Sequence, residues 1–181
     1  IDYQDEKFSA TGDDAYEVKR QTSGYFAGVL HQINKLSIQT NLRRDSVSVA
    51  NAPASGQSQL NDSSATTGLI GVGYQLEQNW RLTSSVSTGF RAPAAAEISS
   101  SPSLKPEKHQ GEEVGIVYSE EKTLARLTYF ESSTKDAIGW AYTGSGSCIQ
   151  NCYENIAQTS NKGFESALRS QWMGNSVNLS L

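Results

Sequence analysis

The strongest regularity in the sequence is an alternation of apolar and polar residues with a period of two. In the segment WRLTSSVSTGF, Trp80, Leu82 and Val86 share one parity, while Arg81 and Thr83 share the other. Successive side chains of a β-strand point to opposite faces, so this period predicts strands rather than helices. The same pattern recurs at 36–42, 114–118, 125–129 and 164–172. The abundance of Thr, Val, Tyr and Ser in these segments also favours strands, and we predict an all-β fold.

The connections between the predicted strands alternate between short and long. Short turns are predicted near 31–34, 77–79, 119–122 and 173–175, and long polar loops near 10–18, 47–64, 92–106 and 133–158. A soluble sandwich has no reason to keep its long loops at one end, whereas a transmembrane β-barrel has short turns on one side and long loops on the other. The predicted strands run for about ten to thirteen residues, long enough to cross a bilayer when tilted.

These patterns together predict about nine strands in an antiparallel up-and-down meander. We expect the meander to be part of a large transmembrane β-barrel, with residues 1–181 forming part of a single barrel domain. The chain begins at Ile1 and ends in NSVNLSL, which alternates like a strand that has just begun. We therefore expect a segment of a longer protein, because open sheet edges are costly in lipid and in water.

The facing of the side chains follows from the barrel hypothesis. The apolar parity is expected to contact lipid, and the polar parity to line the lumen, with Arg43, Arg81, Arg126 and Arg169 among its members. Aromatic residues near the short turns are typical of a girdle at a membrane interface, and three such residues are present: Trp80, Tyr118 and Trp172. In a soluble sheet the same aromatics would cap the ends of a core. The small residues on the apolar parity favour the membrane, because they give little material for a tight core.

Composition and charge exclude several other classes. The net charge is −4, from 15 basic and 19 acidic residues, and no basic stripe is present, so nucleic acid is not an expected partner. The sequence has no catalytic motif, and the neighbouring carboxylates of Glu112 and Glu113 would point to opposite faces of a strand. We predict no enzyme activity, no catalytic residue, no cofactor and no metal site. The acidic GDD stretch (12–14) is either a solvated turn or a calcium ligand.

Two cysteines lie close together in the segment CIQNC. Cys148 and Cys152 have no accompanying cluster of Cys and His at zinc-binding spacing. A small disulfide within one loop is the expected arrangement, which implies an oxidising compartment. The alternative is a pair of free thiols, and alkylation of both before reduction would establish it.

Three short motifs occur in a fixed order along the chain: TGFRAP, SLKPEK and NKGFESAL. Their distinctive residues are Phe90, Arg91, Ala92 and Pro93, then Leu104, Lys105, Pro106 and Glu107, and finally Gly163 and Glu165. In this order and spacing they resemble the later part of the barrel of TonB-dependent outer-membrane receptors. Within that family, the stretch from Ser23 to Asp45 is most similar to a hairpin of the cobalamin transporters. The resemblance covers most of the chain but is patchy in the long loops.

The resemblance implies a bacterial outer-membrane location and contact with outer-membrane lipid. It also implies a 22-stranded barrel that encloses a plug domain, binds its ligand on the outer side and receives energy through TonB. The ligand would be cobalamin or an iron siderophore, and the chain alone would not transport it. The rival from another class is a soluble all-β adhesin or binding module, which would fold cooperatively without detergent.

Overall fold

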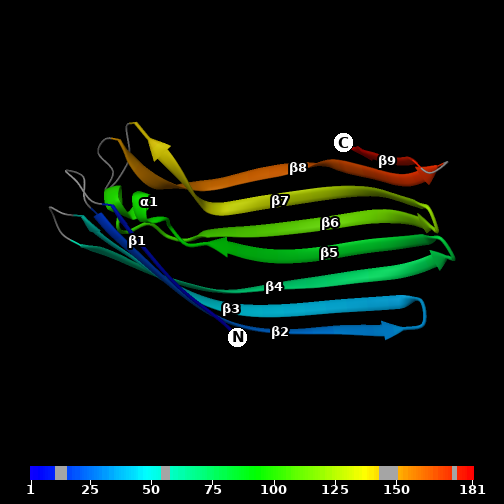
Figure 1. Ribbon diagram of the computed structural model, residues 1–181, viewed down its shortest axis with the longest axis horizontal. Coiled ribbons are helices and arrows are strands. Elements are labelled where there is room, and N and C mark those ends of the chain that lie inside the picture. Colours follow the sequence, from blue (N-terminus) through cyan, green and yellow to red (C-terminus); the bar gives the residue numbers. More distant parts are fainter. Residues whose placement is uncertain (11–15, 54–57, 143–150, 173–174) are drawn as a thin grey trace.

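The computed structural model describes residues 1–10, 16–53, 58–142, 151–172 and 175–181. Within these residues nine strands form one antiparallel sheet in which each strand pairs with its neighbours in the sequence, in the order β1 to β9 (Figure 1). The predicted all-β meander and its strand number are therefore confirmed. The strands are β1 (Asp2–Ala10), β2 (Tyr16–Ile33), β3 (Leu36–Pro53), β4 (Gln59–Glu77), β5 (Trp80–Arg91), β6 (Glu107–Glu120), β7 (Thr123–Ala141), β8 (Cys152–Trp172) and β9 (Asn175–Ser180).

Two-residue turns join the strands at one end of the sheet. These turns are Asn34–Lys35, Gln78–Asn79 and Glu121–Lys122, as the sequence predicted for this end. Asn34 has a φ of 50°, a left-handed conformation that asparagine tolerates better than most residues and that tight hairpins require. The right-hand end of Figure 1 holds these turns, and the longer connections lie at the left-hand end.

The strands are longer than the sequence pattern predicted. β2 and β3 have 18 residues each, β4 and β7 have 19, and β8 has 21. The segments 47–64 and 133–158 were predicted as loops, but most of their described residues continue the flanking strands. In β3 the apolar residues change sides at that level: Leu36, Ile38 and Leu42 share the convex parity, whereas Val47 and Val49 are buried on the concave side, so the pattern of the first half of the strand does not continue although the backbone ladder does. The prediction of long loops in these two segments was wrong for that reason.

The long connection predicted at 92–106 also contains regular structure. Residues 95–100 form the short helix α1 (Ala95–Ser100), which the sequence analysis treated as loop. In the first turn of α1, Oε2 of Glu97 accepts a hydrogen bond from the backbone N–H of Ala94 at 2.6 Å, satisfying a donor that a helix N-terminus leaves free. Among the described residues, no helix is both long and apolar enough to cross a membrane.

The sheet is curved, and helix α1 lies on its concave side (Figure 1). The strand residues of the parity of Val47 and Val49 face the same side, because these two residues pack against Ile98 of α1. On the convex side the opposite parity forms rows of register partners that run across the sheet. One row consists of Leu36, Tyr74, Leu82, Ile116 and Leu127. Tyr74, Leu82 and Leu127 expose 45%, 40% and 48% of their surface. Apolar rows this extensive on the surface indicate contact with another apolar medium.

Candidate functional site

An arginine held by two carboxylates occupies the end of the concave face where the longer connections lie. Arg91 ends β5, Glu107 begins β6, and the two residues are register partners. The Arg91 guanidinium donates to Glu107 at 2.8 and 2.9 Å and to Glu97 of α1 at 2.9 and 3.1 Å. Oε1 of Glu107 also accepts the backbone N–H of Ile138 at 2.8 Å. Paired hydrogen bonds between guanidinium and carboxylate are among the strongest in proteins, so this network fixes α1 and β7 relative to β5 and β6.

The charges of this network stabilise one another. The hydrogen bonds from Arg91 lower the pKa of Glu107, partial burial opposes that shift, and the N–H of Ile138 lowers the pKa further. Hydrogen bonds to Glu107 and Glu97 raise the pKa of Arg91 above its usual range. Both groups lie at strand ends, beyond the apolar rows of the convex face. Arg91 and Glu107 are therefore both ionised at neutral pH.

The connection between β5 and β6 is packed against the concave face. Ile98 of α1 is fully buried and forms a cluster with Val47, Val49 and Ala92. Pro93 and Leu104 are also buried, and α1 contacts strands β3, β4 and β8. This cluster is the described apolar core of the molecule. It holds a long connection inside the curve of the sheet, where a solvated loop would otherwise extend away from it.

Side-chain amides attach the rest of this connection to strands distant in the sequence. Asn155 of β8 accepts from the backbone N–H of Lys105 and donates to the backbone carbonyl of Lys105, both at 2.9 Å. Nδ2 of Asn155 also donates to the carbonyl of Asp136 at 2.7 Å. On the opposite side, Nδ2 of Asn61 donates to the carbonyl of Leu104 at 3.0 Å. The connection therefore spans the concave face between β4 and β8.

The structure brings two of the three sequence motifs together. Arg91 of the first motif binds Glu107 of the second, while the backbone of Lys105 binds Asn155. Ala92, Pro93 and Leu104 are buried, Phe90 packs against the apolar cluster, and Pro106 is partly buried beside it. The third motif lies apart from this network: Gly163 pairs with Phe130, and Glu165 pairs with the buried Thr128. The first two motifs thus encode a structural anchor.

Four arginines predicted to line a lumen share the concave parity. Arg43 binds Asp45 and Asp2 at 2.7 Å. Arg126 donates to Thr128 at 2.9 Å and lies 3.4 Å from Glu113. Arg81 donates to Ser37, and a Cβ at Gly73 would overlap its guanidinium. Arg169 is the register partner of Leu124, which has the parity of Arg126.

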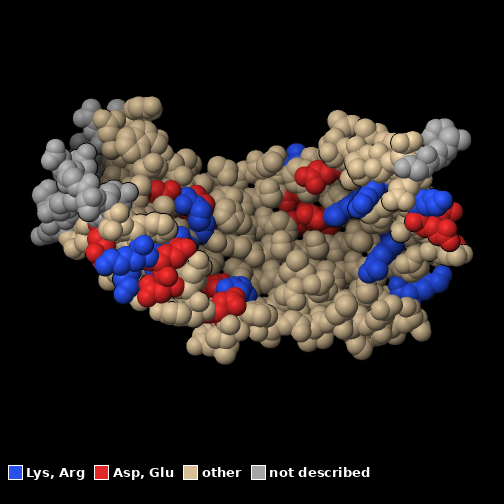
Figure 2. Space-filling model, viewed as in Figure 1, with Lys and Arg blue, Asp and Glu red and all other residues tan. Residues whose placement is uncertain are grey.

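Figure 2 shows acidic and basic side chains gathered near both ends of this hollowed face. A hollow of about 280 Å³ on the concave side is lined by Arg81, Glu113 and Arg126. The concave face therefore offers hydrogen-bonding and charged groups, in contrast to the apolar rows behind it. No group of three or more His, Cys, Asp or Glu residues that would suit a metal ion occurs among the described residues.

The predicted interface aromatics lie at the end with the two-residue turns. Trp80 and Tyr118 are register partners with ring centroids 4.9 Å apart, and the Tyr118 hydroxyl donates to Glu120 at 2.6 Å. Trp172 pairs with Asn175 through the backbone, and its side chain lies outside the described part of the chain. Their membership of a membrane girdle remains a prediction.

The predicted disulfide involves one residue that the structure describes. Cys152 begins β8, is 6% exposed and pairs with Ala141 of β7. The described residues include no free cysteine. Cys148 lies outside them, as does the acidic stretch 12–14, so the Cys148–Cys152 bond and the nature of that turn remain predictions.

A second aromatic pair lies at the other end of the sheet, and the sequence analysis missed it. Trp140 of β7 and Tyr153 of β8 are register partners that pack edge to face, with centroids 4.9 Å apart. Tyr153 is two residues from Asn155, so it shares the side from which Asn155 reaches the β5–β6 connection. Trp140 remains 49% exposed. This pair offers an apolar, planar surface at the end with the long connections.

Sequence reasoning also missed the partners of the motif residues. Glu97, Asn61 and Asn155 complete the anchor but lie in segments that were predicted as polar loops. Their residue types gave only a weak indication of this role, because Asn and Glu side chains commonly hydrogen-bond backbone groups at the ends of helices and loops. Only the folded chain brings Glu97 to Arg91, Asn61 to Leu104 and Asn155 to Lys105.

One family model matches the whole chain, and several solved structures share its fold. The model of the family described as TonB dependent receptor-like, beta-barrel, matches residues 1–181. The FrpB iron transporter from Neisseria meningitidis (F3-3 variant) has a similar structure, with a TM-score of 0.71 and 18% identity over 91% of this chain and 25% of that one. The hemophore receptor HasR of Serratia marcescens has a similar structure, with a TM-score of 0.75 and 15% identity over 98% of this chain and 40% of that one.

The alcaligin outer-membrane receptor FauA from Bordetella pertussis gives a TM-score of 0.72 and 14% identity, over 92% of this chain and 31% of that one. At these identities the likeness shows the fold. The chain spans between a quarter and two-fifths of the length of these three structures. No curated protein sequence matches it significantly.

Proposed function

Because the chain belongs to the TonB-dependent receptor β-barrel family, we propose that it forms part of the wall of an active transporter for a scarce ligand. The family comprises receptors and transporters of the bacterial outer membrane, and the chain is located in that membrane. Energy for uptake would arrive through TonB. The observation that carries the proposal is the contrast between an apolar convex face and a charged concave face that holds an inward-folded connection.

In this proposal the convex rows contact lipid and the concave face lines the lumen. Among the described residues β1 pairs only with β2, and β9 only with β8. The nine strands would therefore continue into further strands of one closed barrel domain in the intact receptor, because unpaired strand edges are not tolerated in a bilayer. The concave face would contact a plug domain, and residues 1–181 alone would not transport.

The aromatic pair of Trp140 and Tyr153 bears on the ligand. A half-exposed indole beside a tyrosine ring favours a bulky, planar or partly apolar ligand, because such rings stack on flat groups. We propose an iron chelate of the siderophore type. Several proteins of similar fold are named for such cargo, including the FrpB iron transporter and the alcaligin receptor FauA.

Cobalamin is the second candidate. The stretch from Ser23 to Asp45, which forms the ends of β2 and β3 around their turn, resembles a hairpin of the cobalamin transporters. The corrin ring is also large and planar. This stretch lies at the end with short turns, away from Trp140, so it gives weaker support for a ligand than the aromatic pair does.

Uptake by cells tests both candidates. A strain lacking the intact receptor would be complemented with it, in the presence and absence of TonB, and supplied with radiolabelled ferric siderophores or labelled cobalamin. We expect uptake of a ferric siderophore that requires both the receptor and TonB. Uptake of cobalamin but not of a ferric siderophore would overturn the proposed siderophore ligand. Uptake of neither compound under nutrient limitation would overturn the proposed transport function.

A further inference from the structure

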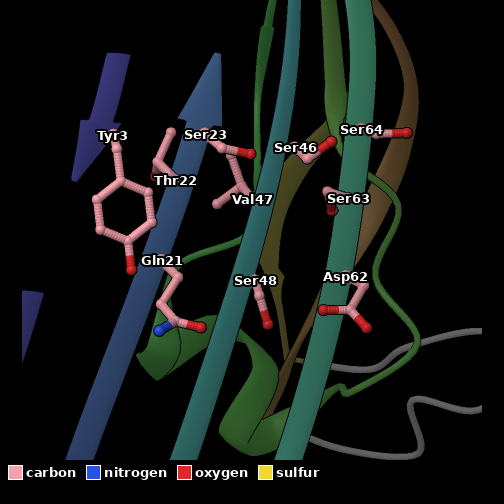
Figure 3. Close-up of a pocket in the computed structure, with 10 residues that line it drawn as sticks. All are labelled: Tyr3, Gln21, Thr22, Ser23, Ser46, Val47, Ser48, Asp62, Ser63 and Ser64. Atoms are coloured by element: carbon pink, nitrogen blue, oxygen red, sulfur yellow. The ribbon is translucent and has the colours of Figure 1, made fainter. Parts of the chain in front are cut away.

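The sheet has a gap between β4 and β5 at the end with the longer connections. The ladder between these two strands ends at the pair of Leu69 and Ser87. Beyond this pair, β4 still pairs with β3 as far as Gln59, and Figure 3 shows β3 alongside β4 at the level of Ser64. β5 still pairs with β6 as far as Arg91. The two parts of the sheet therefore separate here, and Figure 1 shows β4 diverging from β5 towards this end.

A side-chain hydroxyl marks the end of this ladder. In the register of the two strands, Gly68 is the next residue of β4 and lies opposite Thr88. The backbone N–H of Gly68 donates to the hydroxyl of Thr88 at 2.9 Å, in the place where a ladder would use the carbonyl. In the described part of the chain, no hydrogen bond joins β4 to β5 beyond this one.

Alternate backbone groups of β4 point into the gap. The N–H of Gln75 donates to the carbonyl of Lys35, beside β3. Because alternate residues of an antiparallel strand bond to opposite neighbours, the odd-numbered residues of β4 face β3 and the even-numbered ones face away from it. Beyond Gly68, the N–H and C=O groups presented to the gap are those of Leu60, Asp62, Ser64 and Thr66. An unpaired strand edge of this kind can pair with another extended chain.

A hollow of about 510 Å³ lies between the two separated strands. Its lining includes Thr66 and Lys108, which have the convex parity, and Thr67 and His109, which have the concave parity. Phe90 also lines the hollow and packs against the buried cluster of Val47, Val49, Ala92 and Ile98. The hollow therefore extends into the wall between β4 and β5 instead of lying on one face of the sheet.

Cationic side chains flank the gap on both sides. Arg44 of β3 extends over β4, where its guanidinium donates to the hydroxyls of Ser64 at 2.9 Å and Thr66 at 3.1 Å. On the other side, Lys108 of β6 and Lys135 of β7 are register partners, an arrangement of like charges that destabilises a sheet. Neither ammonium forms an ion pair with any residue that the structure describes. Acidic side chains placed in the gap would complement these charges.

The acidic residues of the convex parity confine this attraction to one level. Glu112 and Glu131 lie four residues from Lys108 and Lys135, on the side of the turns, which is roughly 13 Å along a strand. Asp62 lies beyond Ser64, in the direction away from the turns. An occupant of the gap would therefore place its acidic side chains near the level of Ser64 and Thr66.

We propose that an extended segment of a partner protein binds in this gap as an additional antiparallel strand on the edge of β4. Its backbone would pair with residues 60–66, as in complexes in which a peptide extends a sheet. Directly opposite residues of an antiparallel pair share a face, so alternate side chains would meet the cations on the convex side, where glutamate or aspartate fits. The side chains between them would point inwards to Phe90, where small or apolar residues fit.

The position of the gap indicates where this partner is found. In a transmembrane barrel the longer connections lie on the outer side of the membrane, and the gap opens at that end. The partner is therefore a protein at the cell surface. The proposal depends on the membrane location and not on the ligand that the receptor transports.

The test uses the intact receptor in detergent and a labelled peptide as long as the unpaired edge, in which glutamate and valine alternate. Fluorescence anisotropy would measure its affinity. A second peptide has lysine in place of glutamate, a third is N-methylated at the glutamate amides, and a fourth at the valine amides. In the proposed pairing the glutamate amides face β4, and each hydrogen bond contributes a factor of roughly five. We expect methylation there to weaken binding about tenfold or more, and methylation at valine to weaken it much less.

Receptor variants test the two halves of the site. Ser64→Pro removes one N–H that faces the gap and leaves the bonds to β3 intact, because proline is tolerated where the N–H of a strand is unpaired. It should weaken binding about fivefold or more, whereas the matched Ser64→Ala should bind as wild type. Lys108→Gln with Lys135→Gln should weaken binding of the glutamate peptide roughly fivefold. The control for that pair is Lys35→Gln with Lys122→Gln, in turns at the other end of the sheet, and it should bind as wild type.

Hydrogen exchange locates the bound peptide. Saturation with the glutamate peptide should slow exchange in residues 60–66 of the wild-type receptor, because free amides become paired. Unchanged exchange there, or equal affinity for the peptide methylated at glutamate, would overturn strand addition. The methylated peptides are tested on the wild-type receptor, so this result does not depend on the folding of Ser64→Pro. Equal affinity for the lysine peptide would overturn the acidic partner.

Discussion

At the scale of single residues, Arg91 makes the contacts that hold the β5–β6 connection in place. Its guanidinium joins the end of one strand, the start of the next and a short helix through two carboxylates, while Glu107 adds the backbone of β7. Several hydrogen bonds that share one charge act as a unit, and removing one member leaves the others partly unsatisfied. This explains why an FRAP segment and an LKPE segment occur together in one chain: each supplies half of an ion pair.

Removing the charge of Glu107 tests this role. Glu107→Gln should lower the free energy of unfolding of the intact receptor by about 2 kcal/mol, the range for a hydrogen bond to a charged group. Urea unfolding in detergent would measure the change. Glu121→Gln, in an exposed turn, is the control and should change stability by less than about 0.5 kcal/mol. Equal effects in the two variants would contradict the anchor.

The same carboxylate predicts a dependence on pH. Arg91 lowers the pKa of Glu107 below the ordinary value of 4.5, so the folded state binds the proton less well than the unfolded state. The stabilisation is complete above that ordinary value and is lost as the pH falls through the lowered pKa. The difference in stability between wild type and Glu107→Gln should therefore stay constant from pH 7 to about 5 and shrink below about 4. A difference that grows on acidification would contradict this sign.

At the scale of elements, the register of the strands decides which side each residue faces. Leu127 is half exposed in a convex apolar row, and its neighbour Arg126 donates to Thr128 on the concave side. Leu127→Arg should cost on the order of 2–4 kcal/mol near the bilayer midplane. Arg126→Leu removes one exposed ion pair and should cost less than about 1 kcal/mol. Folding into lipid vesicles at increasing urea concentrations compares the two, and equal costs would contradict the facing.

The β5–β6 connection acts as an element in its own right, and Asn155 holds it through the backbone of Lys105. Asn155→Ala should increase hydrogen exchange in residues 92–106 by about tenfold or more, because both hydrogen bonds to Lys105 are lost while the strands remain paired. Asn178→Ala, on the exposed strand β9, is the control. Unchanged exchange in 92–106 would contradict the role of Asn155 in holding the connection.

Most of the strands and their order could be predicted from the sequence. The period of two identified the strands, and the alternation of connection lengths identified the two ends of the sheet. The pattern failed for β3, β4, β7 and β8 beyond the convex apolar rows, because the apolar residues there, such as Val47 and Val49, lie on the concave side and the parity of the rest of the strand no longer applies. It failed again at α1, whose six residues are too few for a helical period and are stabilised by contacts with distant strands.

At the scale of the whole molecule, the two faces of one sheet serve different surroundings. From the turn end, the aromatic pair of Trp80 and Tyr118, the apolar rows and then the basic residues Lys108 and Lys135 lie in succession along the convex side. Arginines bound to carboxylates and hydroxyls occupy the concave side, with a helix folded against it. The motif residues indicated the family, but the anchor they build depends on Asn61, Glu97 and Asn155, which only the folded register brings together.

The facing of β7 in the membrane tests the central claim most directly. Spin labels would be placed singly from Leu124 to Tyr129 of the intact receptor in lipid vesicles, with both cysteines replaced by serine. Labels at Ala125, Leu127 and Tyr129 should be relaxed mainly by lipid-soluble oxygen, and those at Leu124 and Arg126 mainly by a water-soluble nickel chelate. The absence of this alternation, or its reverse, would contradict a barrel wall with its convex face in lipid.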